Sequence, residues 1–249
     1  MSHQNPNPIH AQNPPQLIAA LRRQIARLEG VHRPVRPEGI SSGCTPLDRL
    51  LPGGGFHRGT LVEWLSAADG SGAESLAIVA AREACREGGV VVVLDPRREF
   101  YPPAVARAGI APQCLLVVQP ATEADNHWTL DQALRCAGVA ALLAWPDRLD
   151  GRTFRRLQLA AEEGGGLGLL LRTQAAQAEP SWADVRLMVE PLPAAETSRG
   201  RRLRIDLLRC RHGAGGQSID VEIDDETHTV HLASPVAAAT VRHGCSRAS

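Results

Sequence analysis

The sequence predicts an α/β fold whose mostly parallel sheet is flanked by helices. Two observations support this prediction. Short runs that are almost entirely apolar alternate with segments of helical periodicity, and such runs are typical of strands covered on both faces. Residues 201–210 instead alternate polar and apolar residues and, together with 218–225 and 227–233, indicate C-terminal antiparallel strands. Hydrophobic residues make up 43% of the 249 residues, enough for a substantial core.

The N-terminal region is expected to differ from the rest. Residues 1–14 are polar and rich in proline and asparagine, which favours disorder. Residues 15–30 are predicted to form an N-terminal helix, because apolar side chains recur at helical spacing before Gly30; they include Leu17, Leu21 and Ile25. This helix could pack on its own domain or dock on a partner.

The sheet is expected within residues 41–232, and residues 233–249 are expected to form a flexible tail. The predicted strands cover residues 61–65, 90–94, 114–118, 140–145, 167–172 and 185–190, and an antiparallel group over 201–210, 218–225 and 227–233. The predicted helices cover residues 75–87, 101–109, 128–138 and 153–166. Trp64 and Trp145 lie within predicted strands, where core packing is their expected role.

Composition excludes several classes of function. Lys+Arg and Asp+Glu both number 27, so net charge gives no reason to expect nucleic acid or an anionic membrane as a partner. The chain has no lysine, which excludes any chemistry that needs one. Six cysteines without a CxxC pair indicate reduced thiols, and the absence of a long apolar run predicts a soluble, cytoplasmic protein. Nine histidines lack ligand spacing, so no metal or other cofactor is expected.

One glycine-rich stretch, SAADGSGAESLA (66–77), lies between a predicted strand and helix, where a P-loop would stand. A working P-loop reads GxxxxGK[ST], and its lysine and hydroxyl hold phosphate and Mg²⁺. Gly70, Gly72 and Ser75 are candidate remnants of a nucleotide site. Ala73 and Glu74 follow, however, so the cation is missing and a carboxylate would face the phosphates. The stretch is either a structural connection or a vestigial phosphate site.

Longer segments resemble the RecA core in the same order, over roughly residues 41–230. They are TPLDRLLPGGGFHRGTLVEWL, VVVLDPRREFYPPAVARAGIAPQCLLVVQP, ALRCAGVAALLAW, FRRLQLAAEEGGGLGLLLR and WADVRLMVEPL. The resemblance implies a RecA-like core, but not its chemistry. The family's catalytic glutamate falls on Arg97, and its Walker B aspartate falls near Ala144 or Trp145, with Asp147 slightly late. Its phosphate-sensing glutamine falls near Arg172 or Thr173.

The two loops that carry DNA in RecA correspond to much shorter stretches, around residues 146–152 and 173–182. ATPase and strand-exchange functions are therefore not carried over, and the prediction is a protein that is not an enzyme. Near its C-terminal end the sequence also contains a predicted arginine-rich strand, RRLRIDLLRCRHG.

The N-terminal helix, degraded P-loop and arginine-rich strand together resemble the ImuA family. This resemblance implies an accessory role in DNA repair during the SOS response, in damage-induced translesion synthesis and mutagenesis. It implies an adaptor that bridges an inactive Y-family polymerase homologue (ImuB) and an error-prone polymerase, with RecA as a further candidate partner. DNA contact would be indirect or weak, and no membrane contact is expected.

The arginines of this strand could contact a partner or DNA: Arg201, Arg202, Arg204, Arg209 and Arg211. The alternative is a solvated face, salt-bridged to nearby acids such as Asp220. Only eight aromatic residues (four Trp, one Tyr, three Phe) are present, which disfavours single-strand binding by base stacking.

Two other functions stay open at this point. One is an ATP-binding RecA-like protein with a rerouted site, in which Arg58, Arg97 or Arg98 replaces the lysine. The other is a DNA-binding module that uses the C-terminal arginines, whose affinity would fall steeply with salt.

Overall fold

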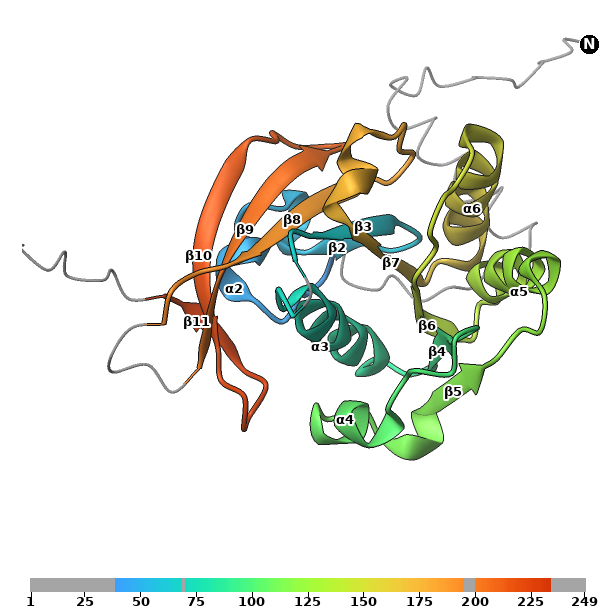
Figure 1. The fold of residues 1–249 in the computed structure, drawn as a ribbon, viewed down its shortest axis with the longest axis horizontal. Coiled ribbons are helices and arrows are strands. Elements are labelled where there is room, and N and C mark those ends of the chain that lie inside the picture. The colour runs from blue at the N-terminus through green and yellow to red at the C-terminus, as the bar shows by residue number, and fades with distance from the viewer. Residues whose placement is uncertain (1–38, 69, 195–199, 234–249) are drawn as a thin grey trace, which may run out of the picture. The chain divides into compact units, whose positions relative to one another are not determined.

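The computed structural model describes residues 39–68, 70–194 and 200–233 (Figure 1). The chain divides into two compact units, Met1–Pro37 and Glu38–Ser249, and every described residue belongs to the second. The predicted helix over 15–30, with Leu17, Leu21 and Ile25, lies outside the described residues. Residues 234–249 of the predicted tail do so as well.

A nine-stranded sheet forms the centre of this unit, with the order β11-β10-β9-β8-β3-β7-β6-β4-β5. Strands β3 to β8 pair in parallel, and β9 to β11 extend the sheet antiparallel beyond β8. The strands are β3 (Leu61–Ser66), β4 (Val90–Leu94), β5 (Leu115–Val118), β6 (Val139–Ala144), β7 (Leu167–Thr173), β8 (Val185–Pro191), β9 (Arg201–Cys210), β10 (Gln217–Ile223) and β11 (Val230–Leu232). The predicted mixture of parallel and C-terminal antiparallel strands is confirmed. A separate antiparallel pair joins β1 (Gly39–Ile40) and β2 (Phe56–His57).

The helices are α2 (Thr45–Asp48), α3 (Ala73–Cys85), α4 (Pro102–Arg107), α5 (Glu123–Arg135) and α6 (Gly151–Gly164), with short 3₁₀ turns at η1 (Pro52–Gly54), η2 (Pro112–Cys114) and η3 (Gln174–Ala178). Helices α3 to α6 connect the parallel strands, whereas the short α2 lies between β1 and β2. Helix α5 begins well before the predicted start at residue 128. Thr122 explains the early start, because its hydroxyl accepts the N–H of Asp125 at 3.1 Å and caps the helix.

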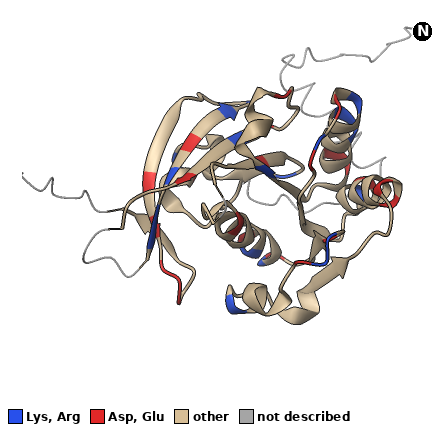
Figure 2. Cartoon of the chain, viewed as in Figure 1, with Lys and Arg blue, Asp and Glu red and all other residues tan. Residues whose placement is uncertain are grey.

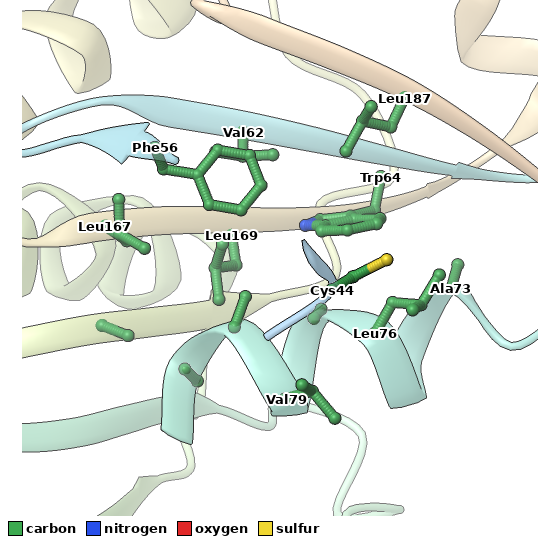
Figure 3. Close-up of a cluster of buried hydrophobic side chains, with 14 of the residues drawn as sticks. Cys44, Phe56, Val62, Trp64, Ala73, Leu76, Val79, Leu167, Leu169 and Leu187 are labelled. Atoms are coloured by element: carbon green, nitrogen blue, oxygen red, sulfur yellow. The ribbon is translucent and has the colours of Figure 1, made fainter. Parts of the chain in front are cut away.

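The core lies on both faces of the sheet. On one face α3 packs over Val62, Trp64 and Leu169, with Phe56 from β2 closing the cluster (Figure 3). Trp64 is fully buried, and its ring meets that of Phe56 edge-on with centroids 6.2 Å apart. Cys44 joins the same cluster, and burial raises the pKa of its thiol from 9.0 to about 11. The core role predicted for Trp64 is thus confirmed.

Trp145 differs from its predicted placement. It lies one residue beyond β6 rather than inside a strand, it is only half-buried, and its ring tilts against Phe100 at 6.2 Å. The apolar run ALLAW continues past the point where pairing with β4 and β7 ends. Hydrophobicity alone therefore overestimated the strand.

On the opposite face, α5 and α6 pack over Leu61, Leu142 and Leu170. The two helices approach closely at the end of α6. A Cβ atom added at Gly164 would lie 1.9 Å from the carbonyl oxygen of Leu134 on α5. Backbone cannot yield as a flexible side chain can, so the position admits only glycine without a shift of one helix.

Replacing Gly164 by alanine is expected to lower the free energy of unfolding by about 1–3 kcal/mol, the usual cost of overpacking. Urea unfolding followed by circular dichroism measures it. Gly138→Ala is the matched control, because the nearest atom to its added Cβ is the Cys136 sulfur at 3.8 Å. Equal losses in the two variants would contradict the close contact between the helices.

Candidate functional site

The segments that follow the parallel strands meet at one edge of the sheet. β3 pairs in parallel with β7 and β8, and β6 pairs in parallel with β4 and β7. The carboxyl ends of parallel strands share an edge, and ligands of open α/β folds bind there. The candidate site is this carboxyl edge, defined by residues 66–68, 70–74, 95–100, 144–147 and 172–179.

The glycine loop after β3 satisfies much of its own polarity. The hydroxyls of Ser66 and Ser71 lie 2.7 Å apart, the Ser66 hydroxyl donates to the Ala68 carbonyl at 2.5 Å, and the Ser71 N–H donates to the same carbonyl at 3.1 Å. Gly72 has a φ of 89°, and a Cβ there would meet the Leu203 side chain of β9 at 2.5 Å. The left-handed backbone of the turn therefore favours this glycine, and a larger residue would also have to displace the Leu203 side chain.

Glu74 occupies the first turn of α3 and has a partner. The indole N–H of Trp145 donates to its carboxylate at 2.8 Å. A carboxylate is favourable at a helix N-terminus, where backbone N–H groups and the helix dipole attract negative charge. Glu74 thus supplies from within the chain the negative charge that a phosphate brings to such a helix.

The loop after β4 carries a second pair. Arg97, at the position of the family's catalytic glutamate, donates to both carboxylate oxygens of Asp147 at 2.7 and 3.0 Å. The side chains are 57% and 81% exposed, so the pair adds little stability. Asp95 is buried instead and accepts the N–H groups of Glu99 and Phe100, which shapes the turn.

A buried ion network lies beneath this surface. Arg172, at the end of β7, is 1% exposed and donates to the carboxylate of Glu63 on β3 at 2.8 Å. Arg186 of β8 has its Nε 2.6 Å from the second Glu63 oxygen, close enough for ion pairing but poorly aligned for a hydrogen bond. Ser181 donates to that oxygen at 2.9 Å. Glu63, which is 0% exposed, is thus held by two arginines and a hydroxyl.

Arg172 also fastens the neighbouring loops. Its guanidinium donates to the carbonyl oxygens of Pro146 and Asp147 at 3.3 and 3.1 Å, and to the Glu179 carboxylate at 2.5 Å. The hydrogen bond from Arg172 lowers the pKa of Glu179 below its ordinary value. Of the two positions near which RecA's phosphate-sensing glutamine falls, Arg172 and Thr173, the first therefore carries a guanidinium committed to protein oxygens.

The arginines of β9 also have partners inside the fold, and Figure 2 shows both charges intermixed along these strands. Arg204 forms two hydrogen bonds with Asp220 at 2.8 and 3.1 Å, which lower the pKa of that carboxyl. Arg201 contacts Asp225 at 2.8 Å and donates to the Ser75 hydroxyl at 3.0 Å. Arg202 is buried and engaged within the fold, opposite Glu222 on β10.

Of the remaining two arginines, Arg209 lies near the other end of β9 and Arg211 directly follows the strand. Arg209 donates to the Ser181 carbonyl at 2.8 Å, and Arg211 binds Glu162 and Asp184 at 3.0 and 2.9 Å. At about 3.3 Å per residue, these ends of the strand are far apart. The geometry favours the salt-bridged alternative, while contact with a partner or DNA stays a prediction for all five arginines.

The structure brings the predicted glycine stretch and the predicted arginine-rich strand into contact, and it adds one residue that was not predicted. Ser75, from the glycine stretch, meets Arg201, from the arginine strand. Gly70 has a φ of 72° and open space where a side chain would be. The residue added is Glu63, whose buried ion pairs are not predicted from the sequence; the one available signal is a carboxylate inside the apolar run TLVEWL.

Two further observations concern the described part of the chain. Within residues 39–68, 70–194 and 200–233, no group of three or more histidine, cysteine or acidic side chains could hold a metal ion. No helix in these ranges has the length and apolar character that a membrane span requires.

A sheet that is parallel through its centre, with a glycine loop leading from β3 into α3, defines a RecA-like protein. The crystal structure of the RadB recombinase has this fold, with a TM-score of 0.61 at 16% identity over 78% of this chain and 100% of RadB. RecA of Nostoc sp. (strain PCC 7120) is 35% identical over 115 residues, 46% of this chain and 31% of that protein. Protein ImuA of Caulobacter vibrioides is 32% identical over 196 residues, 71% of this chain and 80% of that protein. The chain belongs to the ImuA family. No family model matches it.

Glu63→Gln is expected to lower the free energy of unfolding by about 3–5 kcal/mol, because the buried Arg172 would keep only Glu179 as a charge partner and Arg186 would lose the Glu63 carboxylate. Chemical denaturation measures it. Asp147→Asn is the matched control: it removes the same charge from an exposed pair, worth about 0–1 kcal/mol. A Glu63→Gln loss no larger than that of the control would show that the network does not stabilise the fold.

Proposed function

We propose that this chain is a non-catalytic accessory protein of damage-induced translesion synthesis, in which it bridges components of a polymerase assembly. Membership in the ImuA family supports the process. One observation supports the mode of action: at the carboxyl edge, the residues in the positions of RecA's catalytic groups are engaged with other parts of the same chain.

The residues at these positions disfavour the binding and hydrolysis of ATP. Ala73 provides no cation for the phosphates, and Glu74 would repel them while bound to Trp145. Arg97 has the wrong charge for a general base and is paired with Asp147. Arg172 could reach a phosphate only by leaving Glu63 buried and less compensated. Each step toward a nucleotide site thus costs an interaction that the fold already makes.

The proposed partners are an inactive Y-family polymerase homologue and an error-prone polymerase, with RecA as a further candidate, in the cytoplasm. Contact with DNA would be indirect or weak, because the described arginines of β9 are already paired. The helix predicted over 15–30 remains the proposed docking element of the N-terminal region. Capture of the polymerase homologue by a variant lacking residues 1–30 tests it, and undiminished capture would remove that role.

Deleting the gene is expected to lower the frequency of damage-induced mutations several-fold, and the wild-type gene should restore it. Glu74→Ala and Arg97→Ala should restore it equally, because neither residue takes part in catalysis. Drug-resistant colonies counted after ultraviolet irradiation give the readout, with protein levels checked by immunoblot. An unchanged mutation frequency in the deletion strain would overturn the proposed role in damage-induced translesion synthesis. If either variant, present at a normal protein level, failed to restore the mutation frequency, the non-catalytic role would be overturned.

A fluorescent ATP analogue is expected to show no saturable micromolar binding to the purified chain. A rerouted ATP site, the alternative, predicts such binding through Arg58, Arg97 or Arg98, unimproved by Ala73→Lys. Arg58 and Arg97 are paired with Glu87 and Asp147, which disfavours it. Fluorescence titration distinguishes the two, and saturable binding that Arg97→Ala abolishes would establish the rerouted site.

A further inference from the structure

A groove runs along the N-terminal half of α6 and the segment before β8. It has a volume of about 730 Å³ and is lined by Asp150, Gly151, Arg152, Arg155, Arg156, Leu159 and Trp182. Leu159 and Trp182, each 44% exposed, are the two large apolar side chains of the groove. None of these seven residues belongs to the paired groups described for the carboxyl edge.

The charge of the groove is incompletely balanced. Its one carboxylate, Asp150, caps α6 by accepting the N–H groups of Arg152 and Thr153 at 2.8 and 3.0 Å. The backbone N–H of Thr153 contributes most to lowering the pKa of Asp150. Arg156 lies 3.3 Å from Asp131 on α5 and is thereby paired.

Two arginines remain without a carboxylate within ion-pair distance in the described residues, Arg152 and Arg155. The Arg155 guanidinium lies over the Trp182 ring, 5.1 Å from its centroid, and it donates to the Gln158 side chain. A guanidinium over an aromatic ring keeps N–H groups at its rim for a further acceptor. The groove therefore combines an apolar floor with two guanidinium groups that can bind carboxylates in bidentate fashion.

The chain's own undescribed termini do not match this charge. Residues 1–38 carry five arginines against two glutamates, and residues 234–249 carry two arginines and no acid. Single-stranded nucleic acid matches the charge but not the apolar floor. Proteins that bind single-stranded nucleic acid stack successive bases on several aromatic rings. The lining of this groove has one aromatic ring, that of Trp182, and Arg155 covers one of its faces.

We infer that this groove binds a short acidic segment of a partner protein, with one apolar side chain seated against Leu159 and Trp182 and flanking carboxylates held by Arg152 and Arg155. Tryptophan and arginine are the residues that most often dominate binding energy at protein interfaces. The inference rests on the proposed adaptor function, which it deepens by assigning a surface and a partner chemistry.

Selection from a phage library of random peptides of about 12 residues, on the immobilised full-length chain, tests the inference. Peptides in which Asp or Glu flanks Leu, Phe or Trp should be enriched. A fluorescein-labelled synthetic copy of the most enriched peptide should lose at least about tenfold in affinity toward Arg152→Glu/Arg155→Glu and toward Trp182→Ala, measured by anisotropy.

Arg49→Glu/Arg107→Glu is the matched control, with the same charge change at two exposed arginines outside the groove. It should bind the peptide within about twofold of wild type. Thermal melts of all variants establish that they are folded, and any groove variant that fails to fold is replaced by Arg152→Gln/Arg155→Gln.

Three results would overturn the inference. They are enrichment of peptides without net negative charge, equal affinity of the groove variants for the peptide, and tighter binding of a labelled oligothymidylate of about 20 nucleotides through the same arginines. The last would assign the groove to single-stranded nucleic acid. Peptide binding is measured with the purified protein, in the absence of polymerases and DNA damage. A failure of this test is therefore distinguishable from a failure of the mutagenesis test.

Discussion

The buried ion pair between Glu63 and Arg172 is the constraint on which the carboxyl edge depends. Removing two charges from water is costly, and their attraction offsets the cost only with good geometry and further hydrogen bonds. Both conditions are met, because Arg172 also donates to the backbone of the loop after β6 and to Glu179. In a nucleotide-binding protein, phosphate and metal contribute to ordering such loops, whereas here one arginine connects them to the central strand.

The surface pairs follow from this buried one. Arg172 donates hydrogen bonds to the carbonyl oxygens of Pro146 and Asp147. Pro146 directly follows the residue of one surface contact, and Asp147 takes part in the other. Trp145, just before Pro146, is thereby positioned to donate to Glu74, and the Asp147 side chain to meet Arg97. Exposed ion pairs contribute about 0–1 kcal/mol, too little to order a loop alone. The buried ion pair therefore orders the loops, and the surface contacts depend on it.

Sequence patterns were sufficient for the fold because the parallel strands are short apolar runs with few alternatives, as in 61–65, 90–94 and 167–172. They were weaker where polar local chemistry decides. Helix α5 begins at Glu123 through the Thr122 cap, in a stretch without apolar periodicity. Similarity to RecA marked positions 97 and 172 as altered, yet it could not reveal that Arg172 meets Glu63, 109 residues away. Long-range pairing of charges depends on the register of three strands, which no local pattern encodes.

The retained glycine illustrates why a degraded motif is poor evidence for its former ligand. Gly72 is favoured by its left-handed backbone, and a side chain there would press on Leu203, which belongs to the antiparallel extension of the sheet. From the same strand, Arg201 reaches Ser75 in the first turn of α3. β9 thus packs against the loop that a nucleotide would otherwise organise, and Glu74 in the first turn of α3 accepts the indole N–H of Trp145. A loop held by protein on these sides needs its glycine for packing, so changes at Ala73 and Glu74 can abolish phosphate binding while the RecA-like framework stays intact.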